Sequence, residues 1–161
     1  MLKLTKKADY GLIALKHMAT VSLRRPAVAS AKEIADRYRI PLPLLSKVLQ
    51  QLSRNGFLAS VQGTHGGYRL AREAGRITVL EVIRSIDGPI ILTSCFTEHK
   101  ECDQSAQCTV REPLRRVHES ILALLDSISI ADLLDEQDCA TDAAPSERLI
   151  DASLILPALR N

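Results

Sequence analysis

Three cysteines, Cys95, Cys102 and Cys108, lie within fourteen residues of one another in the middle of the chain. Thiolates are preferred ligands of soft metal ions and of iron–sulfur clusters. Zinc sites usually contain cysteine pairs two residues apart, whereas the gaps here are six and five residues, which suits a loop wrapped around a larger group. The trio therefore predicts an iron–sulfur cluster (2Fe-2S or 4Fe-4S), with a zinc site or redox-active thiols as alternatives.

Other side chains bear on how such a site is completed. The residues between the cysteines are largely polar, which argues against three buried apolar thiols, and Cys139 lies far away and is interpreted as a bystander. Disulfides are disfavoured in a reducing cytosol. Three thiolates leave one iron position without a protein ligand, and the candidates for it are Asp9, His99, His118 or a small exogenous ligand. Without a cluster, His99 is an exposed loop residue and Asp9 an acidic group that favours a helix N-terminus.

Charge divides the chain into two unlike halves. Residues 1–75 contain 13 Lys and Arg against 4 Asp and Glu, whereas residues 76–161 contain 8 against 15. The basic front half is expected to face a polyanion. No apolar run reaches the ~18 residues that span a bilayer, and the N-terminus lacks the apolar stretch of a secretory signal, so a cytoplasmic protein without membrane contact is expected.

The elements that position these residues are mostly helical. Because the chain has no Trp and only two Phe, its core must be aliphatic, which favours helices. Hydrophobic spacing, caps and turn residues predict helices over 6–22, 30–37, 43–54, 79–86 and 112–127, and strands over 57–61 and 67–70. Ser30 and Glu33 form a capping-box pattern at the start of the second helix. The fold class expected is mainly α: a winged helix-turn-helix with a small β wing and a long C-terminal dimerisation helix.

The third predicted helix carries a recognition surface. Leu45, Val48, Leu49 and Leu52 form its buried stripe, which leaves a polar face that offers cation, amide and hydroxyl donors to base edges and phosphates. The members of this face are Ser46, Lys47, Gln50, Gln51 and Arg54.

Four regions are expected along the chain. They are a DNA-binding head (1–90), a cluster-binding cysteine loop (91–110), a dimerisation helix region (111–135) and a flexible polar tail (136–161). The apolar stripe of the long helix is expected to pair with a second copy, which predicts a homodimer. The members of this stripe are Leu114, Val117, Ile121, Leu124 and Leu125.

Several of these motifs together resemble the Rrf-two family of bacterial winged-helix regulators, which has IscR-like and NsrR-like branches. The resemblance rests on residues 3–6 with Tyr10, the helix-turn-helix, the wing sequence 66–72, and three cysteines ahead of a long helix. The segment 88–95 is most similar to the branch that regulates SUF-system cluster assembly genes. The resemblance implies a homodimer that reads a partly palindromic DNA operator, with its affinity or sequence choice set by cluster occupancy.

Two positions depart from the IscR-like pattern. IscR-like proteins take a fourth ligand from a His three residues after the last cysteine, where this chain has Arg111. NsrR-like members use an Asp in the first helix of the partner subunit, and Asp9 matches that position, so the resemblance implies Asp9 as the fourth ligand. In the wing, IscR-like proteins present an Arg where this chain has Gln62; with His65 and Arg69, Gln62 completes the expected DNA-binding set.

No catalytic constellation is present at credible spacing, so the chain is expected not to be an enzyme and to have no small-molecule substrate. The function predicted is iron–sulfur-dependent control of transcription, of cluster assembly (SUF) genes, by a regulator expected to be a repressor. The alternatives are a nitric-oxide or redox-sensing repressor of the same family, a zinc- or thiol-based repressor, and an iron–sulfur carrier.

Overall fold

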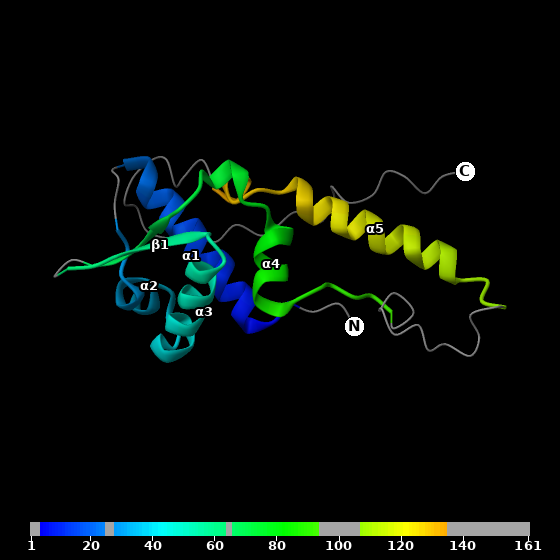
Figure 1. Cartoon of the computed structure of the whole chain (residues 1–161), viewed down its shortest axis with the longest axis horizontal. Coiled ribbons are helices and arrows are strands. Elements are labelled where there is room, and N and C mark those ends of the chain that lie inside the picture. The colour runs from blue at the N-terminus through cyan, green and yellow to red at the C-terminus, as the bar shows by residue number, and fades with distance from the viewer. Residues whose placement is uncertain (1–3, 25–27, 64–65, 94–106, 135–161) are drawn as a thin grey trace, which may run out of the picture.

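The computed structural model describes residues 4–24, 28–63, 66–93 and 107–134 (Figure 1). In chain order its elements are α1 (Lys6–Arg24), α2 (Ala31–Tyr38), α3 (Leu42–Arg54), β1 (Leu58–Val61), β2 (Gly67–Leu70), η1 (Ala74–Arg76), α4 (Val79–Asp87), α5 (Arg111–Ser127) and η3 (Ala131–Leu133). The predicted mainly helical winged helix-turn-helix is confirmed. No helix in these ranges is both long enough and apolar enough to cross a membrane.

The core of the head is aliphatic and lies where α1 meets α3 and α4. Leu15, Leu45, Leu49 and Leu52 are fully buried in it. Thr5 caps α1, because its hydroxyl oxygen accepts a hydrogen bond from the Ala8 amide at 3.2 Å. The three helices therefore form one packed unit that orients α3.

The wing is a two-stranded antiparallel hairpin. Leu58 pairs with Leu70 and Val61 with Gly67. The strand β2 also pairs with the chain just before α2, because Ala29 and Tyr68 exchange two backbone hydrogen bonds of 2.9 Å. A Cβ atom on Gly67 would lie 2.5 Å from the Ala29 carbonyl oxygen, so only glycine allows this approach. The wing is thereby tied to the helix-turn-helix.

The long helix α5 leads away from the head, and only the end near Ser127 lies beside α4 (Figure 1). The chain after α5 returns to the head: Val79 donates a backbone hydrogen bond to Ile128 (2.8 Å), Ile130 donates one to Ile77 (2.8 Å), and Ile130 is fully buried. The sequence-based division placed 111–135 in one region. In the structure, the stretch after α5 belongs to the core of the head.

Candidate nucleic-acid interface and metal ligands

The turn between α2 and α3 is held by local hydrogen bonds. The predicted capping box is present at the start of α2: the Glu33 amide donates to the Ser30 hydroxyl at 3.1 Å, and the Ser30 amide donates to the Glu33 carboxylate at 3.4 Å. Arg39 ends α2 in the left-handed conformation, with φ of 54°. Buried Ile40 and the extended Pro41 then redirect the chain into α3. These residues set the angle between the two helices.

The helix α3 has one apolar and one polar face. Leu45, Val48, Leu49 and Leu52 are buried, as predicted from their spacing. Lys47, Gln50 and Arg54 are exposed, and Ser46 is half-buried beside them. The four polar residues therefore share a solvent-facing strip of α3 that combines two cations with an amide and a hydroxyl.

Gln51 has a different environment from the rest of the predicted set. Its side-chain amide donates to the Ser85 carbonyl oxygen at 2.7 Å and approaches that of Ile86 at 3.4 Å, and the residue is half-buried. These contacts occupy the donors that base recognition requires. We therefore separate Gln51 from the exposed strip.

The wing presents two of the three predicted polar residues to solvent. Gln62 at the end of β1 and Arg69 on β2 are exposed, whereas His65 lies outside the described residues. Because β2 pairs with the chain leading into α2, the positions of Arg69 and of the helix-turn-helix are fixed relative to each other.

A buried histidine of α1 contacts two side chains of α2. His17 on α1 is 3% exposed, its Nδ1 lies 3.2 Å from the Tyr38 hydroxyl, and its Nε2 lies 3.7 Å from a Glu33 carboxylate oxygen. Burial lowers the pKa of His17 below its ordinary value, the positive charge of Arg37 adds to this effect, and Glu33 opposes it. The neutral imidazole is therefore the form that the fold prefers.

The predicted metal ligands are described only in part. Cys108 is half-buried, is not in a disulfide and lies three residues before α5, and Asp9 is half-buried in the first turn of α1. His118 is half-buried within α5. Cys95, Cys102, His99 and Cys139 lie outside the described residues. Among the described residues, no three His, Cys, Asp or Glu side chains are close enough to hold a metal ion.

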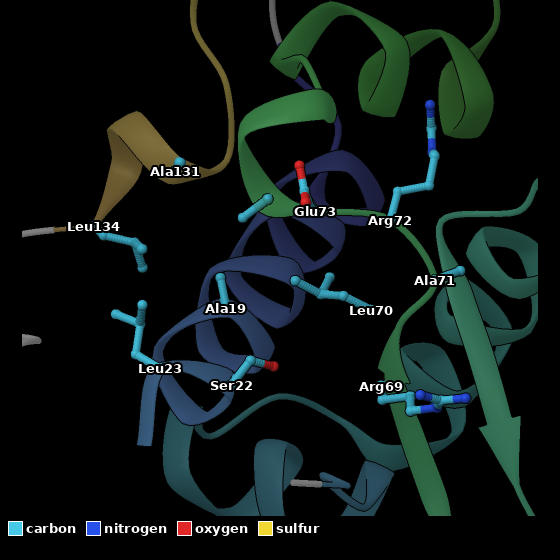
Figure 2. A pocket seen from close by; sticks show the side chains of 11 residues that line it. Ala19, Ser22, Leu23, Arg69, Leu70, Ala71, Arg72, Glu73, Ala131 and Leu134 are labelled. Atoms are coloured by element: carbon cyan, nitrogen blue, oxygen red, sulfur yellow. The ribbon is translucent and has the colours of Figure 1, made fainter. Parts of the chain in front are cut away.

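Hollows on the described surface include one near each end of α1. One, of about 450 Å³, is apolar and lies between the start of α1, the segment 88–91 and α5, with Leu4, Ile91 and Leu124 in its lining. The other, of about 600 Å³, lies beside the wing (Figure 2). There Leu23 and Leu134 point toward each other, whereas the side chains of Arg69 and Arg72 extend away from them.

The comparisons with known proteins agree with this geometry. The family model described as "Rrf2: Iron-dependent Transcriptional regulator" matches residues 4–136. The structure of CymR (YrzC), the global cysteine regulator of B. subtilis, is 27% identical and covers 88% of this chain and 100% of its own, with a TM-score of 0.69. T. potens IscR is 30% identical and covers 89% of this chain and 94% of its own, with a TM-score of 0.66.

Proposed function

Because this chain belongs to the Rrf2 family of transcriptional regulators, we propose that it is an iron–sulfur-cluster-dependent regulator of cluster assembly (SUF) genes that acts as a homodimer on operator DNA. The observation that carries the proposal is the cysteine trio placed between a basic winged head and α5. Regulation by this chain requires binding to DNA and no catalysis.

The DNA-contacting surface is the strip on α3 together with the wing. Lys47 and Arg54 neutralise phosphates, Gln50 and Ser46 reach base edges, and the wing residues Gln62, His65 and Arg69 contact the neighbouring groove. The exposure of Lys47, Gln50, Arg54, Gln62 and Arg69 supports this assignment.

The donor set fits an iron–sulfur cluster chemically. Cys95, Cys102 and Cys108 would hold it through thiolates, with the Asp9 carboxylate of the partner subunit as a labile fourth ligand. The half-buried, disulfide-free Cys108 and the half-buried Asp9 are compatible with these roles. When bound, a cluster supplies a group that reacts with oxidants and nitric oxide. Residues 88–93 then connect the thiol segment to α4 of the head.

The dimer is formed through α5 and the apolar hollow beside it. Val117 and Leu124 on α5 are 48% and 61% exposed, and Leu4 and Ile91 on the rim of the hollow are each 44% exposed. Large side chains exposed together in this way are typical of a surface that a second subunit covers.

The spectrum of anaerobically purified protein tests the cofactor. We expect a brown protein, loss of the visible chromophore in Cys102→Ala, and a more labile chromophore in Asp9→Ala with an intact head. The matched control is Cys139→Ala, which should keep the wild-type spectrum. A colourless wild-type protein with stoichiometric zinc would refute the cluster assignment.

A second function is favoured by one observation, the 27% identity to the global cysteine regulator CymR over nearly the whole chain. In that case the chain would control cysteine-related genes without a cluster. A colourless, metal-free protein that binds DNA with full affinity would support this alternative.

A further inference from the structure

The end of α4 is capped by side chains of another helix. The last four carbonyl groups of a helix have no partner within it. In α4 the Arg84 carbonyl accepts a hydrogen bond from the Gly88 amide at 3.0 Å. The next carbonyl, that of Ser85, accepts one from the Gln51 side chain at 2.7 Å, with the Asn55 amide nitrogen at 3.4 Å. The recognition helix thus supplies the cap of α4.

The same end of α4 is also held from α1. The Thr5 hydroxyl donates to the Asp87 carboxylate, whose two oxygens lie at 2.7 and 2.9 Å. Further along α1, Gly11 packs against the Ile86 side chain of α4: a Cβ atom there would lie 2.4 Å from Ile86 Cδ1. Three helices therefore meet at residues 85–87.

We propose that Gln51 is a positioning residue for DNA recognition: it orients α3 by bonding the end of α4 and makes no contact with DNA. The hydrogen bonds of one amide to successive carbonyls restrict both the rotation of α3 about its axis and its displacement along α4. When α3 rotates, the solvent-facing strip of Ser46, Lys47, Gln50 and Arg54 rotates with it. The inference rests on the proposed role of α3 as recognition helix.

Gln51→Met in the full-length protein tests the inference, because Met has a similar length and high helix propensity but no donor. The probe is a duplex that the wild-type protein selects from random-sequence DNA, with single base-pair variants of it. We expect about 5- to 30-fold weaker binding to the selected duplex. The loss should be spread over all positions of each half-site, with unchanged binding to unselected DNA.

Two further variants make the result specific. Gln50→Met, the matched control, should lose discrimination at one or two adjacent positions of each half-site. Gln51→Arg keeps a donor within reach of the same helix end, so its ratio of selected to unselected affinity should return to the wild-type value. If Gln51→Arg keeps the wild-type ratio and Gln51→Met does not, the loss in Gln51→Met comes from the missing hydrogen bond to α4. Thermal melts of all three variants would show any general loss of folding.

Each contrary result identifies which part of the account fails. If Gln51→Met lost discrimination at a single base pair as Gln50→Met does, or bound the selected duplex like wild type, the positioning role would be wrong. A wild-type protein that selected no sequence would overturn the DNA-reading role of α3 and the inference with it.

Discussion

Gln50 and Gln51 are adjacent and chemically identical, yet one faces solvent and the other caps a neighbouring helix. Helical periodicity predicts that both lie off the apolar stripe, which is correct. It does not predict that α4 ends beside Gln51, because that neighbour is separated by 34 residues in sequence. The polar face of α3 was therefore predictable from the sequence, whereas the hydrogen bond of Gln51 to α4 required the fold.

The buried His17 links the stability of the head to pH. Its pKa is lowered mainly by burial, so the unfolded chain, with the ordinary value of 6.5, takes up a proton at a higher pH than the folded protein. The stabilising effect of the neutral form is fully present above pH 6.5 and is lost as the pH falls below it. Melting temperatures should therefore fall between pH 7 and pH 5, and less steeply in His17→Gln. Parallel curves for the two proteins would contradict this.

Arg39 occupies a backbone conformation that suits glycine. A left-handed residue with a side chain costs ~1–2 kcal/mol, part of which glycine recovers. Arg39→Gly should therefore raise the free energy of unfolding by up to ~1 kcal/mol in urea titrations. The matched control Lys47→Gly, in the middle of α3, should lower it by ~1 kcal/mol. Destabilisation of similar size in both variants would show that the Arg39 side chain outweighs its backbone strain.

At the scale of elements, helix starts set by neighbouring residues were predicted better than contacts between distant segments. The capping box of Ser30 marks the start of α2 correctly, because a cap depends on residues three positions apart. The return of the chain to the head after α5 was not predicted, because the three residues 128–130 are too few to show a periodic pattern. The positions of Cys95 and Cys102 remain predictions because both lie outside the described residues.

The proposed phosphate contacts of α3 can be measured through the salt dependence of DNA binding. Each phosphate contact releases counterions, so log Kd depends linearly on log salt concentration. Lys47→Ala should reduce the magnitude of that slope by ~1 per half-site with little change in base preference. Lys32→Ala, an exposed cation on α2 outside the proposed strip, serves as the comparison. An unchanged slope for Lys47→Ala would remove Lys47 from the interface.

At the scale of the whole molecule, α5 projects from the basic head, and the proposed function assigns DNA binding to the head and subunit pairing to α5 (Figure 1). The outer end of α5 carries ion pairs of Arg115 with Glu112 and Glu119. The hydrogen bonds and positive charges of Arg115 and Arg116 lower the pKa of Glu112 to about 2. The exposed Val117 lies among these charged residues, and the exposed Leu124 follows them along the helix.

Pairing through α5 predicts a change in mass. Leu124→Glu should convert a dimer into a monomer in light scattering coupled to size-exclusion chromatography, because it places a charge in the proposed contact. Ala123→Glu, an exposed change on the same helix outside the apolar stripe, should leave the dimer intact. Dimers of equal stability in both variants would place the subunit contact elsewhere.

The most direct measurement compares the affinity of the iron- and sulfide-loaded protein with that of the metal-free protein for one promoter fragment at one salt concentration. A regulator controlled through its thiol segment should show about a 5- to 150-fold difference, which corresponds to a coupling of ~1–3 kcal/mol. Equal affinity and equal selectivity of the two forms would contradict the account.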